Sequence, residues 1–142
     1  MPYAPSKQAT PSPSTRIELQ NELDTFLTAY EEAINRKDLE QVMSLLAKDA
    51  IFSSPNADSL KGRSSIRNAL EEAWKDGQEE TLALHEREWT LATYWTSVCT
   101  YQFTVEGRLK DQHQRCEGHR TAVLRRLDGS WRILHEHSSI AP

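Results

Sequence analysis

The closing segment of the chain, residues 120–142, limits the possible folds more than any other stretch. It reads RTAVLRRLDGSWRILHEHSSIAP, and two apolar-rich runs flank Asp128-Gly129. This dipeptide accepts the positive φ angles of a two-residue type I′ turn, so the segment is predicted to be a β-hairpin. The turn sets a register in which one face carries Val123 opposite Leu134, Thr121 opposite Glu136 and His119 opposite Ser138. The other face carries Leu124, Ile133, Ala122, His135, Arg120, His137, Arg126 and Trp131. Because both faces mix apolar and polar residues, each is expected to be covered.

The composition restricts the class of protein. The 142 residues are enough for one domain with a core, and 37% hydrophobic with 27% charged residues is typical of a soluble globular chain. A net charge of −4 argues against nucleic acid as the partner, because phosphate binding needs a basic field. No run approaches the roughly 20 apolar residues of a membrane span, so no membrane partner is expected. Cys99 and Cys116 are predicted to be free thiols of a cytoplasmic protein.

The chain is predicted to begin with a tail and a long helix. Residues 1–14, rich in Pro, Ser and Thr, are predicted to be disordered, and a single domain is predicted over 15–142. The segment 15–18 matches a capping box, which predicts the helix start. The following apolar residues recur on one helical stripe: Leu19, Leu23, Phe26, Tyr30 and Ile34.

Two shorter helices and a group of long strands are predicted to follow. Asp38 is expected to cap a second helix that ends at 48–49, and residues 50–52 form a short β run stopped by the turn residues 53–56. Gly62 is expected to open a third helix that Gly77 closes. Strands are predicted at about 82–93 and 95–106, before the hairpin from about 113 to 140. Helices on one face of an antiparallel sheet make an α+β domain.

The other face of that sheet is predicted to form a dimer. In the hairpin register it carries Leu124, Trp131 and Ile133, which are too apolar to be left in water. A homodimer, or a higher oligomer, is therefore expected through these residues together with His135 and His137.

Four stretches resemble one family. They are YEEAINRKDL at 30–39, LAKDAIF at 46–52, LKGRSSI at 60–66 and DGSWRILHEHSSIAP at 128–142. The first three are similar to nuclear transport factor 2-like (SnoaL-like) domains. The last is similar to the branch that holds the association domain of calcium/calmodulin-dependent protein kinase II. The resemblance implies a cone-shaped, cystatin-like roll, in which three helices close a strongly curved antiparallel sheet around a pocket.

The resemblance also implies which residues face that pocket. The ligand-binding positions it indicates are Tyr30, Phe52, Ser54, Trp74, His119, Thr121, Val123, Leu134, Glu136 and Ser138. In the ketosteroid isomerases of this fold, a tyrosine donor on the first helix corresponds to Tyr30, but the carboxylate base corresponds to Ser54. Without a base, enolisation has no proton acceptor, so isomerase chemistry by that arrangement is not expected.

Glu136 and Tyr30 are the remaining candidates for catalysis. A carboxylate under a lid of helices is expected to have a raised pKa and to serve as an acid or base. The alternative is that an arginine from a neighbouring strand pairs with Glu136 and makes it structural. For Tyr30 the alternative is a core tyrosine with one hydrogen bond. His135 and His137 suggest a metal site, but no third ligand is compelled by the spacing, so neither a metal nor a cofactor is predicted.

The sequence leaves three functions open. The favoured one is a small-molecule-binding homodimer with its ligand inside the cone. The second is an isomerase, cyclase or hydratase acting on a small apolar or polyketide-like substrate, with Glu136 as the acid or base. The third is a non-catalytic association module.

Overall fold

The computed structural model describes residues 13–54, 57–75, 79–109 and 111–141. Most of the predicted tail, residues 1–12, lies outside the described residues. The helix α1 spans Pro13–Arg36, α2 spans Leu39–Ser44 and α3 spans Arg63–Trp74. The predicted capping box at 15–18 is not the helix start, because α1 already begins at Pro13, where proline suits the first turn.

One face of α1 packs against the sheet. Leu19, Leu23 and Tyr30 of the predicted stripe are buried, and Phe26 and Ile34 pack half-buried against the same core. Among the helices of the described segments, none combines the length and the apolar character that crossing a membrane requires.

The two short helices begin as their sequences predict. The side chain of Asp38 accepts a hydrogen bond from the backbone N–H of Gln41 at 3.1 Å, which caps α2. Gly62 precedes α3 with φ = +91°, a conformation that favours glycine. The helix ends at Trp74, and the predicted stop at Gly77 lies outside the described residues.

Six strands form one curved sheet. They are β1 (Leu46–Ser54), β2 (Ala57–Lys61), β3 (Glu79–Ala92), β4 (Thr96–Leu109), β5 (Gln112–Leu127) and β6 (Ser130–Ile140). Their order across the sheet is β2-β1-β6-β5-β4-β3, and every neighbouring pair is antiparallel except β1 with β6. The prediction missed β2 and placed the start of β1 too late, since residues 48–49 lie inside it.

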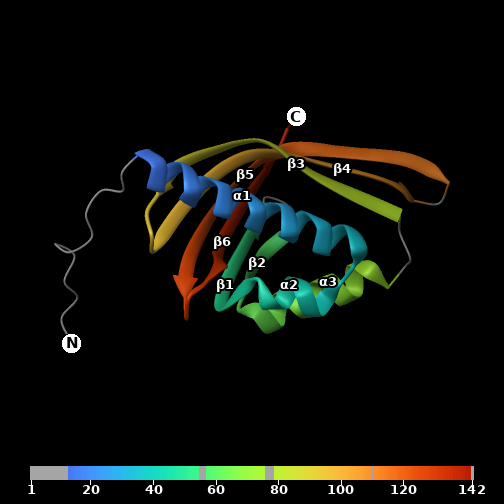
Figure 1. The fold of residues 1–142 in the computed structure, drawn as a ribbon. Coiled ribbons are helices and arrows are strands. Elements are labelled where there is room, and N and C mark those ends of the chain that lie inside the picture. Colours follow the sequence, from blue (N-terminus) through green and yellow to red (C-terminus); the bar gives the residue numbers. More distant parts are fainter. Residues whose placement is uncertain (1–12, 55–56, 76–78, 110, 142) are drawn as a thin grey trace.

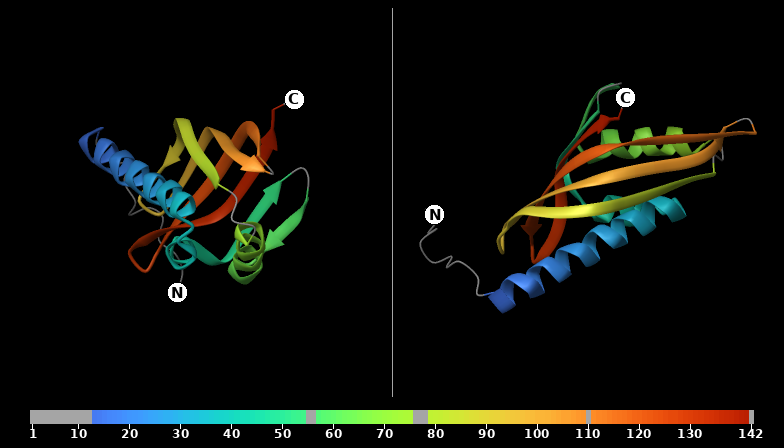
Figure 2. Two further views of the ribbon diagram at one scale, coloured as in Figure 1. Left: turned by 90° about the vertical axis from the view of Figure 1, so that its right-hand side faces the viewer. Right: turned by 90° about the horizontal axis from the view of Figure 1, so that it is seen from above.

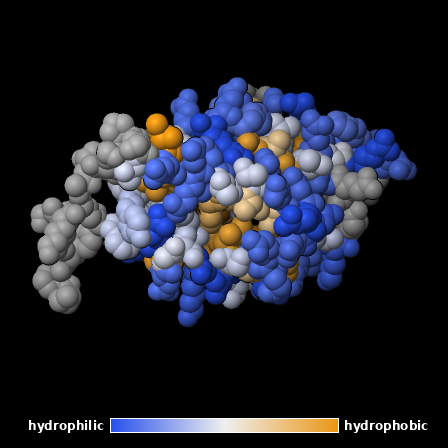
Figure 3. Space-filling model, viewed as in Figure 1, coloured by the Kyte–Doolittle hydropathy of each residue, from blue (hydrophilic) through white to orange (hydrophobic). Residues whose placement is uncertain are grey.

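The helices lie on the concave side of the bent sheet, which confirms the α+β prediction (Figure 1, Figure 2). Helix α1 packs against β3, and α3 packs against β1. A space-filling view shows hydrophilic residues over most of the helical side, with hydrophobic side chains visible between α1 and the other two helices (Figure 3). The core therefore lies between the helices and the inner face of the sheet.

Polar side chains of α1 form hydrogen bonds with backbone groups on the unpaired edge of β3. The Asn35 side-chain amide donates to the carbonyl of Leu82 at 2.9 Å and accepts from its N–H at 2.7 Å. Glu31 accepts from the N–H of Leu84 at 2.7 Å. An edge strand leaves such groups unpaired, so these contacts fix α1 along the rim of the sheet.

The register of the closing hairpin is as predicted only near the turn. Leu127 pairs with Ser130 and Leu124 pairs with Ile133, but the next pair is Val123 with His135. Leu134 is therefore the additional residue of a β-bulge, which shifts all later pairs by one position. The predicted register is wrong beyond Leu124.

The bulge changes which residues of the hairpin face the core. Leu124, Trp131 and Ile133, predicted on the outer dimer surface, are at most 5% exposed and lie in the core. Past the bulge, Glu136 pairs with Ala122, and both are buried on the inner face. The inward-facing positions of β6 thus change from odd to even numbers at Leu134, which a regular alternation does not predict.

Candidate functional site

A cavity of about 250 Å³ lies between the helices and the inner face of the sheet. Its apolar wall is formed by Ile34, Phe52, Leu70, Ala73, Trp74, Leu82 and Val105. Its polar lining is formed by Tyr30, Asn35, Lys37, Glu80, Arg120 and Glu136. Such a combination, mostly apolar with a few convergent polar groups, is typical of small-molecule sites.

The polar end of the cavity is a buried cluster around Glu136. The Tyr30 hydroxyl donates to Glu136 Oε2 at 3.3 Å. Arg120 Nε lies 3.4 Å from Glu136 Oε1 and donates to Ser138 Oγ at 2.9 Å. The side chains of Arg120 and Glu136 are only 14% and 6% exposed. This arrangement matches the alternative in which an arginine of a neighbouring strand pairs with the carboxylate.

Arg120 is held from several sides. Its guanidinium carbon lies 4.6 Å from the centroid of the Phe103 ring, a cation–π distance. Burial lowers the pKa of Arg120, but Glu136 and the two nearby tyrosines raise it by more, so its net pKa is raised and the guanidinium stays charged. The ion pair is thus a fixed feature of the cavity wall.

Two tyrosine hydroxyls adjoin the ion pair. Burial, followed by the charge of Glu136, raises the pKa of Tyr30 well above its usual range, and the same two causes raise the pKa of Tyr101. Both are therefore neutral donors at ordinary pH. The Tyr101 hydroxyl is buried beside the Arg120 guanidinium, which lowers the pKa of Tyr101 against those two causes without cancelling them.

The structure distributes the predicted ligand-binding residues over several places. Tyr30, Phe52, Trp74 and Glu136 line the cavity, and Ser138 is buried against Arg120. Ser54 is exposed at the end of β1, and Leu134 packs half-buried against the core at the bulge.

The remaining predicted residues do not share a face with Glu136. His119, Thr121 and Val123 alternate with the buried Ala122 and Leu124, so they lie on the outer face of the sheet. The expectation that they line the pocket came from the resemblance, which set the inward parity, together with the unbulged register. The bulge at Leu134 moves Glu136 to the opposite parity and separates it from them.

Arg120 and Tyr101 were missed by the sequence reasoning. The predicted register placed Arg120 on the outer face beside His137, whereas in the structure it pairs with Ser138 on the inner face. Tyr101 is opposite Arg120 on β4. Arg120 lies on the same face of β5 as the apolar Ala122. A charged residue among apolar residues of one strand face is the sequence signal that could have predicted an inward-facing cation.

His135 and His137 lie on the outer face, opposite Val123 and Thr121. In the described part of the chain, no group of three or more His, Cys, Asp or Glu residues is arranged to hold a metal ion. Cys99 is buried, Cys116 is half-buried, and both are free thiols, as predicted.

The sequence of residues 23–142 matches the family described as SnoaL-like domain. The chain belongs to the SnoaL-like family. No curated protein matches this member of the family.

Solved structures share the fold of this SnoaL-like chain at low sequence identity. A nuclear transport factor 2-like superfamily protein from Salmonella enterica has a TM-score of 0.77 at 19% identity, with 89% of this chain and 93% of that chain covered. A protein with a cystatin-like fold from Novosphingobium aromaticivorans has a TM-score of 0.74 at 17% identity, covering 87% and 82%. A Catenulispora acidiphila protein in complex with S-DNPA has a TM-score of 0.76 at 16% identity, covering 87% and 94%. These similarities establish the cystatin-like fold.

Proposed function

We propose that this SnoaL-like chain binds a small molecule inside the cone, with an apolar body among the cavity-lining side chains and a polar end at Tyr30, Arg120 and Glu136. The observation that carries the proposal is the cavity itself, whose walls are apolar and whose inner end is charged. Its volume of about 250 Å³ lies just below the roughly 300–1,000 Å³ range of ligand pockets, so the ligand is small. The complex of the Catenulispora acidiphila relative with S-DNPA gives supporting precedent within the fold.

The polar cluster indicates the chemistry of the ligand's polar end. Arg120 Nε is engaged by Ser138 and Glu136, while the remaining guanidinium N–H groups are donors close to the cavity. Glu136 supplies acceptor oxygens, of which one already takes the Tyr30 hydroxyl. A hydroxyl group, which can accept from Arg120 and donate to Glu136, fits this end best, and a carbonyl oxygen, which accepts from Arg120 alone, still fits it better than a bare hydrocarbon.

Native mass spectrometry on freshly purified protein tests the proposal. We expect a co-purifying small molecule, and we expect its loss in the Ala73→Phe variant, which adds bulk to the α3 wall of the cavity. Asn68→Phe, on the same helix but outside the cavity lining, is the matched control and should retain the molecule. A wild-type protein without bound molecule that also fails to bind an apolar dye would refute the pocket.

An acid–base reaction is the second candidate function. It is favoured by one observation: Tyr30 and Glu136 both line the cavity and are joined by a 3.3 Å hydrogen bond. A base and a donor at one end of an apolar cavity are what an isomerase, cyclase or hydratase needs. Glu136→Gln keeps the shape and removes the base, so it should abolish turnover of any substrate found; unchanged turnover would remove Glu136 from the chemistry.

We also propose a homodimer through the outer face of the sheet, although the residues on that face differ from those in the sequence prediction. The outer face carries Val123, His135 and His137. Arg125 lies directly opposite Arg132, and Arg132 Nε is buried with no hydrogen-bond partner among the described residues. Like charges in a cross-strand pair are destabilising, so a carboxylate from a second copy would relieve this position.

Light scattering measures the assembly. A dimer that Val123→Glu converts to a monomer is expected, whereas a wild-type monomer at micromolar concentration would end the dimer proposal. A ring of about ten chains would instead favour the association-module function. We place the chain in the cytoplasm, where Cys99 and Cys116 remain thiols.

A further inference from the structure

A second cavity adjoins the first, on the same face of the sheet. It has a volume of about 130 Å³ and is lined by Glu80, Val105, Gly107, Arg108, Gln114, Arg115 and Cys116. These residues come from the ends of β3, β4 and β5, and the cavity contributes nothing to the Glu136 cluster described above.

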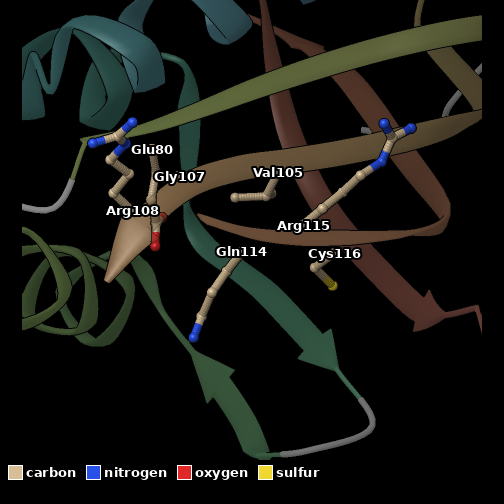
Figure 4. A pocket seen from close by; sticks show the side chains of 7 residues that line it. All are labelled: Glu80, Val105, Gly107, Arg108, Gln114, Arg115 and Cys116. Carbon is tan, nitrogen blue, oxygen red and sulfur yellow. The ribbon is translucent and has the colours of Figure 1, made fainter. Parts of the chain in front are cut away.

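The strand register places this second cavity on the inner face. Val105 pairs with Cys116 and Gly107 pairs with Gln114, and in β5 these positions alternate in step with Arg120. Figure 4 shows the side chains of Gln114 and Cys116 pointing to one side of the hairpin and that of Arg115 pointing away. The inner face of β5 therefore continues without a bulge from Arg120 of the ion pair to Cys116 and Gln114.

The two cavities share part of their walls. Glu80 and Val105 line both of them. The first cavity is mainly apolar along its sides, whereas the second offers the Gln114 amide and the Glu80 carboxylate. A molecule that fills the first cavity and extends past Val105 meets both donors and acceptors.

We propose that the two cavities form one elongated binding site, whose ligand has an apolar body in the cone and a hydrogen-bonding tail that reaches Gln114 and Cys116. This inference rests on the proposed function and adds the class of ligand. The ligand is an amphipathic molecule with a polar head at Arg120 and Glu136 and a tail bearing amide-like groups that both donate and accept.

The two cysteines provide a selective reporter for the tail. Burial raises the pKa of the Cys99 thiol to about 12, so Cys99 is unreactive in the folded protein. Cys116 is half-buried and lines the second cavity. Alkylation by iodoacetamide under native conditions should therefore modify Cys116, and Cys116→Ser should abolish the signal.

Two dyes with the same body separate the two cavities. Dansylamide has the aromatic body alone, and dansylglycylglycine adds a short peptide tail. Both dyes should gain fluorescence on binding, and both should lose it with Ala73→Phe, a variant in the first cavity. At about ten times its Kd, dansylglycylglycine should slow Cys116 alkylation about tenfold, whereas dansylamide should leave the rate unchanged.

A variant of the exposed Gln114 isolates the contribution of the tail. Gln114→Leu should weaken dansylglycylglycine about fivefold, the loss expected for one neutral hydrogen bond, and leave dansylamide binding unaffected. Binding of both dyes with equal Cys116 alkylation rates would refute the elongated site and leave the cone pocket intact. Failure of both dyes to bind would refute the cone pocket and the elongated site together.

Discussion

The Arg120–Glu136 ion pair is the polar feature on which the cavity depends, and a double-mutant cycle tests its strength. The variants are Arg120→Met, Glu136→Gln and the combination. With Arg120 Nε 3.4 Å from Glu136 Oε1, an effective dielectric constant of about 20 gives an attraction of about 5 kcal/mol. Desolvation of the two groups offsets much of this gain, but removal of one partner leaves the other charge buried and unpaired.

Each single variant should therefore lower the free energy of unfolding by about 3 kcal/mol. Arg120→Met leaves the carboxylate with the Tyr30 hydroxyl as a neutral donor, and Glu136→Gln leaves the guanidinium with Ser138 and the Phe103 ring. The double variant should cost less than the sum, with a coupling energy of about 2 kcal/mol, because neither charge is then stranded.

Urea unfolding followed by tryptophan fluorescence measures these values, with an unchanged m-value as the check on two-state behaviour. Arg115→Met is the matched control, since Arg115 is 55% exposed and its ion pairs with Glu106 and Glu117 lie at the surface. It should cost less than about 1 kcal/mol. A coupling energy below about 0.5 kcal/mol between Arg120 and Glu136 would refute the view that the pair acts as a unit.

Three further measurements follow from the same geometry. Tyr30→Phe removes the hydroxyl that donates to Glu136 and should cost about 1–2 kcal/mol, whereas Tyr101→Phe, which leaves the Glu136 carboxylate its donor, should cost less; denaturant midpoints that reverse this order would contradict the assignment. The free energy of unfolding should fall as pH rises from about 9 to about 12, by about 1.4 kcal/mol per pH unit for Cys99 alone, because the thiol ionises first in the unfolded chain. Cys99→Ala should flatten this decline, and an equally steep curve for the variant would contradict the role of Cys99. Gly118→Ala should destabilise the protein by more than about 2 kcal/mol, because the added Cβ would overlap the Ser139 carbonyl oxygen. Gly129→Ala, in the open turn, should cost only about 1 kcal/mol, and equal thermal shifts for the two variants would show that the strands move apart freely.

Local sequence signals determined much of the architecture. The stripe from Leu19 to Ile34, the cap at Asp38 and the positive φ at Gly62 each depend on residues within one or two turns. The Asp128-Gly129 turn likewise set the register of its nearest pairs, and both turn residues have positive φ. Strand β2 and the parallel pairing of β1 with β6 were missed, because β pairing between distant segments leaves little local pattern.

The arrangement of the site depends on one additional residue in β6, Leu134 of the β-bulge, which the sequence pattern does not predict. Strict alternation from the turn predicts that Glu136 shares a face with Thr121 and that Trp131 and Ile133 lie on the other face, which was predicted to be the outer one. The bulge at Leu134 reverses the parity, so that Trp131 and Ile133 enter the core and Glu136 still reaches the cavity. It also turns Glu136 toward Arg120 rather than His119. The sequence by itself determined that this hairpin has two different faces. Only the tertiary structure decided which residues occupy each, because the additional residue of the bulge at Leu134 shifts the pairing of all later residues and exchanges their faces.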